Sequence, residues 1–365
     1  MLKSKKFWSY DLCQTSELRP ELFENYKIKG KFFEDVLYFY KEIGIAPHPS
    51  LRQPTNKEIT EVTSISFINS KVDLNTLKIL IHLLPFSKIV SLKFCTNNFD
   101  INNLEFLIDS ILTKPNNLFF FSYEWNDKLS IEDKVISITS ELDEANIEIF
   151  KKQQELMNKL CTSQKLEGLC LRGNLMGDEC AIKIFETLKE NQMLKTLSLY
   201  NNNLTSACID AFCSMLLVNR KLEEINLGRN KFVDDDLTKI KDNTGMYLMS
   251  NEDVENYNKK VKERDQIIKN NTKLRSQKKP EVEVPFLNEM ENINGQNFIV
   301  KNKNLKSLNL MQNLFTDKCI DDLKFILENN EELLITINEK IFTEEQRNQL
   351  LDKANKFKDR IYFSK

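Results

Sequence analysis

One repeated spacing constrains the fold of this chain more than any other feature. The pattern L-x-x-L-x-L-x-x-N, with isoleucine in one leucine slot of the last copy, occurs in three segments that start 28 residues apart, at Leu166, Leu194 and Leu222. A constant period of this length indicates that each copy forms one supersecondary unit, which needs its neighbours to complete a hydrophobic core. The sequence therefore predicts a stack of similar units.

The spacing is that of the leucine-rich repeat. Its inward leucines predict a short strand, and the intervening side chains point to the other face of the sheet. The next segment is predicted to be helical, because Cys180, Ile184 and Leu188 recur at i, i+4 and i+8. The predicted fold is an α/β leucine-rich-repeat solenoid, a curved horseshoe with parallel strands on the concave face and helices on the convex face. Less regular copies start at Val62, Ile89, Leu118, Leu305 and Leu333.

The repeat also predicts structural roles for asparagine and cysteine. We expect the amide of a repeated asparagine to bond the backbone of neighbouring turns. Cys180, Cys208 and Cys319 each lie 14 residues after the first leucine of a repeat, which predicts equivalent, reduced packing residues with no zinc or disulfide role. The repeated asparagine slot is filled by Asn97, Asn126, Asn174, Asn202, Asn230 and Asn313.

The domain organisation follows from where the pattern begins and where it is interrupted. Residues 1–55 do not follow the repeat, although the aromatic run 32–40 predicts a short helix. We interpret this region as a cap over the first repeat, with a docking arm anchored by aromatic residues such as Trp8 as the alternative. Residues 56–365 are assigned to the repeat domain, with a charged insertion at about 240–300 and a C-terminal capping helix over Thr343–Phe357 that leads into the apolar run at Ile361.

Two segments interrupt the repeats. The extra residues between Leu118 and Leu166 predict a longer helix within 131–160. In the insertion, the charged stretch Asn251–Lys279 carries Val254, Tyr257, Val261 and Ile268, whose spacing predicts one stripe of an exposed helix or a short coiled-coil face. Partial disorder is the alternative for this stretch. Further on, Asn294 and Gly295 predict a hairpin turn.

The concave face is the predicted binding surface. Most side chains that alternate with the inward leucines are small and polar, so the large ones are the candidate anchors for a protein partner. The candidate partner-binding residues, including those of the N-terminal region and the insertion, are Trp8, Phe120, Glu124, Trp125, Arg172, Tyr200, Arg229, Met311, Tyr257 and Val261.

Known catalytic motifs are missing from the sequence. It has no glycine-rich phosphate loop and no G-x-S-x-G or H-E-x-x-H motif, and its two histidines, His48 and His82, lie in a proline-rich stretch and an apolar run. We expect a binding module with no catalytic, cofactor or metal site. Charge is balanced, with 52 basic and 54 acidic residues, so neither nucleic acid nor membrane is an expected partner. No signal or membrane-spanning run is seen, which predicts a soluble cytoplasmic protein.

The period and the helical return segment resemble the ribonuclease-inhibitor class of leucine-rich repeats. Regular repeats that end at Phe232, a charged insertion, then Pro285, a turn at Gly295 and a further repeat at Asn304–Asn313 resemble the ciliary leucine-rich repeat-containing protein seventy-one family over about residues 165–327. This resemblance implies a non-enzymatic scaffold of the ciliary axoneme, at a radial spoke or the central apparatus.

Two alternatives share the same repeat class. The first is a regulator of a small GTPase of the Ran-activating type, and the second is a soluble nuclease inhibitor. A GTP-hydrolysis assay separates the first from a scaffold, because an activating protein would stimulate hydrolysis by several orders of magnitude.

Overall fold

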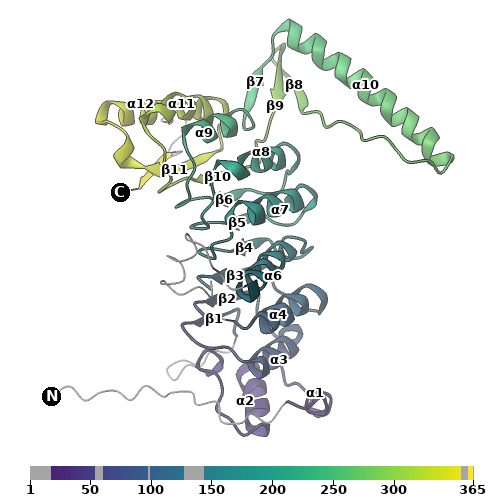
Figure 1. Cartoon of the computed structure of the whole chain (residues 1–365), viewed down its shortest axis with the longest axis vertical. Helices are drawn as coiled ribbons and strands as arrows, with labels where there is room; N and C mark the ends of the chain where they lie inside the picture. The colour runs from purple at the N-terminus through teal and green to yellow at the C-terminus, as the bar shows by residue number, and fades with distance from the viewer. Residues whose placement is uncertain (1–17, 54–60, 98, 127–143, 355–360, 365) are drawn as a thin grey trace.

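A large parallel sheet dominates the structure (Figure 1). The computed structural model describes residues 18–53, 61–97, 99–126, 144–354 and 361–364 of the chain. Within these ranges the sheet has nine strands that lie side by side in chain order, and the inserted strands β7, β8 and β9 form a separate sheet. Its strands are β1 (Ser64–Ile68), β2 (Ser91–Cys95), β3 (Phe120–Glu124), β4 (Gly168–Cys170), β5 (Thr196–Ser198), β6 (Glu224–Asn226), β10 (Ser307–Asn309), β11 (Leu334–Asn338) and β12 (Ile361–Ser364).

Helices form a second layer beside the sheet, and successive helices pack on one another (Figure 1). In α7 the predicted buried face is confirmed, since Cys180, Ile184 and Leu188 are all buried. Cys208 and Cys319 are buried as well, as their equivalent positions predict. The helices of this layer are α3 (Leu74–Leu83), α4 (Ile101–Thr113), α6 (Glu144–Leu160), α7 (Gly177–Glu190), α8 (Ile209–Val218), α9 (Asp234–Lys241), α11 (Ile320–Asn329) and α12 (Glu344–Ala354). Short 3-10 turns accompany them: η1 (Pro49–Leu51), η2 (Leu84–Phe86), η3 (Ser206–Cys208), η4 (Asp317–Cys319) and η5 (Glu339–Ile341).

The strand register follows the repeat. From the copy at Val62 to that at Leu305, the second apolar position pairs with the same position of the next copy, and Leu308 then pairs with Ile335. These side chains are buried because they face the helices. One strand was not predicted: β12 pairs in parallel with β11, although the sequence placed this apolar run at the end of a capping helix. The capping helix itself, α12, ends at Ala354 among the described residues. The paired series runs Ile65, Leu92, Phe121, Leu169, Leu197, Ile225, Leu308 and Ile335.

The lengthened repeat before Leu166 contains α6. This helix confirms the second part of the expected 131–160 helix, while residues 127–143 lie outside the described part of the chain. It packs between α4 and α7. Lys152 and Lys159 of α6 form ion pairs with Glu105 and Asp109 of α4 at 2.7 and 2.6 Å.

The repeated asparagines form the predicted ladder. The side-chain Oδ1 of Asn202 accepts from the backbone N–H of Asn174 at 2.9 Å, and that of Asn230 accepts from the N–H of Asn202 at 3.0 Å. The same relation joins Asn126 to Asn97 at 2.6 Å. Each Nδ2 group in turn donates to backbone carbonyls, so these buried amides are structural.

A second asparagine series, three residues before the first leucine of a repeat, was missed by the sequence interpretation. Asn191 donates to the carbonyl oxygens of Cys161 and Ser163 at 2.7 and 3.1 Å. Asn219 and Asn302 repeat this arrangement in the following units. These buried amides bond the free carbonyls at the C-terminal end of the preceding unit's helix, which would otherwise lack partners.

The N-terminal region packs on the first repeat. Helix α2 (Phe32–Glu42) confirms the helix expected over 32–40 and contacts α3, with α1 (Pro20–Asn25) beside it. Its Phe39 and Tyr40 are buried, and the Tyr40 hydroxyl bonds Thr76 on α3 at 2.7 Å. Helix α2 thus lies against the first repeat, and its role as a cap stays a prediction. Trp8, the anchor in the alternative interpretation, lies outside the described residues.

The insertion forms an arm that leaves the body next to α9 (Figure 1). It comprises β7 (Met246–Leu248), the long helix α10 (Asn251–Ser276), β8 (Glu289–Ile293) and β9 (Gln296–Val300). The three strands form a small antiparallel sheet, and Asn294 and Gly295 make the predicted hairpin turn with φ of 52° and 83°. The charged stretch is helical, as one of the two alternatives predicted.

Candidate interaction surface

The sheet has an open face, defined by the side chains that alternate with the buried ones. In β1 this alternation is regular, with Ser64, Ser66 and Ile68 exposed between the buried Ile65 and Phe67. Across the strands, most open-face residues are small or polar. Their aligned series begins with Ser64, Ser91, Phe120, Gly168, Thr196, Glu224 and Ser307.

A turn of the same conformation follows the strand in successive repeats, and it determines where the side chains after the strand point. In the copies that start from Val62 to Leu305, the eighth residue has a positive φ, between 48° and 70°, which is uncommon for residues other than glycine. Most of these N–H groups donate to the next repeat, such as that of Trp125 to the Arg172 carbonyl at 2.9 Å and that of Arg229 to the Met311 carbonyl at 2.7 Å. The positions are Asn69, Thr96, Trp125, Gly173, Asn201, Arg229 and Gln312.

Four of the predicted partner-binding residues come together beside these turns. The Arg172 guanidinium lies 4.2 Å from the centroid of the Tyr200 ring and 5.6 Å from that of Trp125. The Tyr200 hydroxyl donates to Gln312 Oε1 at 2.8 Å. Met311 and Tyr200 both pack over Gly228, where a side-chain Cβ would meet each of them at 3.0 Å. We call Trp125, Arg172, Tyr200 and Met311 the stacked column.

Arg172 has an unusual environment within this column. Its Nε is buried without a hydrogen-bond partner, and no carboxylate within the described residues forms an ion pair with the guanidinium. Stacking on two aromatic rings therefore fixes the cation in place of a salt bridge. A guanidinium held in this way can recognise a planar carboxylate or a peptide carbonyl with its remaining N–H groups.

Glu124 takes part in a different cluster on the same face. Its Oε1 accepts from Lys93 at 2.8 Å, from Ser122 at 2.6 Å and from the Cys170 thiol at 3.4 Å. Burial favours the neutral acid, but the hydrogen bonds from Lys93 and Ser122 outweigh it and lower the pKa of Glu124. This carboxylate is 8% exposed and already paired, so it supports the surface more than it offers a free charge.

The other predicted residues are separate from the column. Phe120 is half-buried on β3 and lies over Gly168, where a Cβ would meet its ring at 2.4 Å. Arg229 is exposed at its turn and has no side-chain hydrogen bond or ion pair to another described residue. Tyr257 and Val261 lie on the arm, half-buried, and the Tyr257 hydroxyl donates to the Asn288 carbonyl at 2.8 Å. The stripe predicted as a coiled-coil face is thus partly covered by the arm's own chain.

Sequence reasoning missed Gly173 and Gln312, and it placed Gly228 on the concave face without its role beneath Tyr200 and Met311. Gly173 lies directly under Trp125, and a Cβ there would meet the indole at 2.3 Å. The signal was present in the repeat: these three residues fill the seventh or eighth position, where the strand ends and side chains turn outward. Small residues at such positions mark a close approach by a large neighbour.

The histidines occupy packing positions. His82 lies on α3 with its ring 4.6 Å from that of Phe23 and 5.6 Å from that of Phe39. Burial and the nearby Lys114 lower its pKa. His48 Nδ1 accepts from the Ser50 N–H at 3.1 Å and caps a short turn.

Substitution of Gly173 tests whether this glycine positions Trp125. Gly173→Ala is expected to cost about 1–3 kcal/mol, because the added methyl group displaces the indole and strains a positive φ. Gly177→Ala is the matched control, since Gly177 has a similar φ of 67° but open space around it. It should cost about 1 kcal/mol and leave Trp125 in place.

Urea unfolding and tryptophan fluorescence measure both effects. A Trp8→Phe background leaves Trp125 as the only tryptophan, because the chain has two. A shifted emission spectrum is expected for Gly173→Ala alone. Identical spectra for the two alanine variants would show that the glycine does not position the ring.

No protein-family model matches the chain, and no curated protein matches it. Within the described ranges, no helix combines the length and apolarity needed to cross a membrane. The same ranges contain no cluster of three or more metal-ligating side chains.

Proposed function

We propose that this protein is a non-enzymatic interaction scaffold, a leucine-rich-repeat solenoid that binds a partner polypeptide on the open face of its sheet. The 28-residue spacing, the parallel sheet and the one-sided helical layer support this assignment. A row of aligned parallel strands presents side chains at regular intervals, which suits an extended protein partner.

The stacked column carries the proposal. Arg172 is a fixed cation without an acidic partner among the described residues, and it lies between two aromatic side chains that are themselves suited to protein contacts. Tryptophan, tyrosine and arginine dominate the binding energy of protein interfaces. A partner segment that presents a carboxylate to Arg172 and an apolar group to Trp125 or Met311 fits this surface.

We further propose that the scaffold belongs to the ciliary axoneme, at a radial spoke or the central apparatus. The resemblance of the repeat and insertion layout to the ciliary family supports this location. Proximity labelling from the tagged protein in ciliated cells tests it, and labelled axonemal proteins are the expected result. Localisation only outside cilia would refute the axonemal proposal and leave the binding surface to be tested separately.

Substitution of Arg172 tests the surface itself. Arg172→Ala is expected to weaken binding of the partner identified by proximity labelling by about thirtyfold. This is the effect of a hot-spot residue that contributes about 2 kcal/mol to binding. Arg172→Lys should recover little, because an ammonium group lacks the planar stacking of a guanidinium.

Arg229→Ala is the matched control, because it removes an exposed, unstacked arginine from the next turn but one. It should weaken binding by no more than about threefold. Equal losses for the two arginines, measured by titration calorimetry, would show that the column has no special role.

A further inference from the structure

The arm is stabilised by hydrogen bonds and an ion pair between its own residues. Helix α10 begins at a capping box, in which Asp253 N donates to Ser250 Oγ at 3.1 Å and Ser250 N to Asp253 Oδ2 at 3.0 Å. The segment 281–288 then runs back along one side of the helix (Figure 1). Asn271 bonds the backbone of Val282 through both ends of its amide, at 2.6 and 2.8 Å, and Arg275 binds Glu281 through two 2.8 Å hydrogen bonds.

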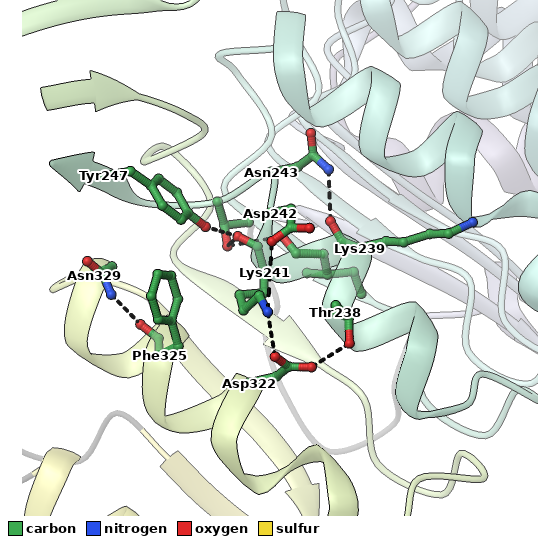
Figure 2. A network of polar contacts seen from close by, with 11 residues as sticks. Thr238, Lys239, Lys241, Asp242, Asn243, Tyr247, Asp322, Phe325 and Asn329 are labelled. Carbon is green, nitrogen blue, oxygen red and sulfur yellow. Dashed lines mark hydrogen bonds and ion pairs between the residues drawn. The ribbon is translucent and has the colours of Figure 1, made fainter. Parts of the chain in front are cut away.

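The base of the arm is fixed to the body. Figure 2 shows Asp322 of α11 between Lys241 and Thr238 of α9, with the Lys241–Asp322 ion pair at 2.6 Å. The Tyr247 hydroxyl on β7 donates to the Lys241 carbonyl, and its ring lies 5.4 Å from that of Phe325. Gly245 lies against the Asn329 carbonyl, where a Cβ would be only 2.5 Å away. These contacts hold the arm in a defined direction relative to the sheet.

The outer side of α10 carries a stripe of lysines. Lys259, Lys262, Lys269 and Lys273 recur with helical spacing, and Gln266 fills the place between them. Tyr257 and Asn271 face the returning segment, since both bond it. Lys259 follows Tyr257 by two residues and Lys273 follows Asn271 by two, so both lysines lie about 200° around the helix from that segment. All four lysines are exposed, and none forms an ion pair or side-chain hydrogen bond with another described residue. The stripe spans about 21 Å.

This part of the arm is strongly basic in a chain of balanced charge. Residues 259–279 contain nine lysines and arginines but only two acidic residues, Glu263 and Asp265, whereas the whole chain has 52 basic and 54 acidic residues. Both acidic side chains flank the stripe, and only Arg275 of the basic set is paired, with Glu281. The four positive charges of the stripe, which extends over about 21 Å, repel one another. A ligand of opposite charge therefore stabilises the helix.

The chemistry favours an acidic protein over the other polyanions. Single-stranded nucleic acid is bound by aromatic platforms as well as cations, and α10's one aromatic ring, Tyr257, is engaged with the returning segment. A membrane-surface helix needs an exposed apolar face, but the apolar side of α10 is partly covered by the returning segment, and Ile268 is the one large apolar side chain of this helix that is exposed. Glu263 and Asp265 beside the stripe would repel closely spaced phosphates more than separate carboxylates.

We infer that the arm is a second docking element, whose stripe of Lys259, Lys262, Lys269 and Lys273 binds a glutamate- or aspartate-rich segment of a partner protein. This surface is distinct from the stacked column, so the inference goes beyond the proposed function. Exposed lysines contribute modestly one by one, and binding through four of them falls steeply with salt concentration.

A charge-removal experiment on the full-length protein tests the inference. The arm variant carries K259Q, K262Q, K269Q and K273Q, and the control variant carries K165Q, K221Q, K231Q and K318Q. The control removes the same number of exposed, unpaired lysines from the body, so both variants have equal net charge. Fluorescence anisotropy with a labelled oligoglutamate peptide should show binding at least about tenfold weaker for the arm variant and within about twofold for the control.

Other outcomes of this experiment would overturn the inference. Equal losses in both variants would show a diffuse charge effect, and no binding by the parent protein would refute the site. Tighter stripe-dependent binding to single-stranded DNA, or to vesicles of phosphatidylcholine and phosphatidylserine, would replace the acidic protein with another partner. In the Arg172→Ala background the four arm substitutions should weaken peptide binding by the same factor as in the parent protein, which separates a failure here from a failure of the proposed function.

Discussion

Replacement of Phe94 by alanine is expected to lower the free energy of unfolding by about 3–5 kcal/mol. The Phe94 side chain on β2 is fully buried, and its ring stacks on that of Phe67 at 4.9 Å with an angle of 2° between the planes. It also contacts Phe99 at 5.2 Å and Phe121 at 6.0 Å. Truncation leaves a cavity that β1 and β3 cannot fill without breaking their register with β2.

Urea unfolding followed by circular dichroism measures this loss. Phe119→Ala is the control: its ring is 47% exposed just before β3, so its removal should change stability by no more than about 0.5 kcal/mol. Phe94→Leu should recover more than half of the loss, because leucine fills this position in later repeats. A cost below about 1 kcal/mol for Phe94→Ala would mean that the aromatic layer contributes little to the core.

The repeated part of the fold was predictable because one short pattern determines several properties at once. The spacing of Leu166, Leu169 and Leu171 sets the strand, the inward face and the register with the next unit. The same reasoning reached the degraded copies, including β11. Periodicity works here because each unit contacts mainly its neighbours in the chain, so local sequence and tertiary packing agree.

Features that depend on distant or irregular contacts were not predicted. The β12 strand joins the sheet after a polar helix, and four residues are too few to carry a repeat signal. The asparagines that end helices, such as Asn191 and Asn219, bond carbonyls about 30 residues away. The helical stripe at Tyr257 was recognised, but its occupant is the returning segment, whose path no spacing rule specifies.

The candidate site was predictable as a set of residues but not as a set of contacts. Alternation along the strands pointed to Arg172 and Tyr200 on one face, and the turn position pointed to Trp125. The stacking of Arg172 on both rings depends on side-chain direction after a positive φ and on Gly173 beneath the indole. The paired state of Glu124 depends on Lys93 of one neighbouring strand and Cys170 of the other.

The second large effect is expected at Asn202, whose replacement by alanine should cost about 2–4 kcal/mol of unfolding free energy. Its Oδ1 accepts from the Asn174 N–H at 2.9 Å, and its Nδ2 donates to the Leu171 carbonyl at 2.9 Å. The site is fully buried, so water cannot replace either bond. Alanine therefore removes the acceptor of two buried N–H groups, those of Asn174 and Met176, while the Leu171 carbonyl keeps its bond from Asn174 Nδ2.

The effect should also reach the stacked column, because Asn202 holds the backbone on either side of Arg172. Leu171 precedes that arginine, Asn174 follows the glycine under Trp125, and both are bonded by the Asn202 amide. Asn258→Ala on α10 is the control, since this exposed asparagine makes no side-chain hydrogen bond to another described residue, and it should change stability by no more than about 0.5 kcal/mol. In the Trp8→Phe background, folded Asn202→Ala should show altered Trp125 fluorescence together with the lower urea midpoint. A normal folded spectrum with the full loss of stability would mean that the asparagine ladder supports the core without positioning the column.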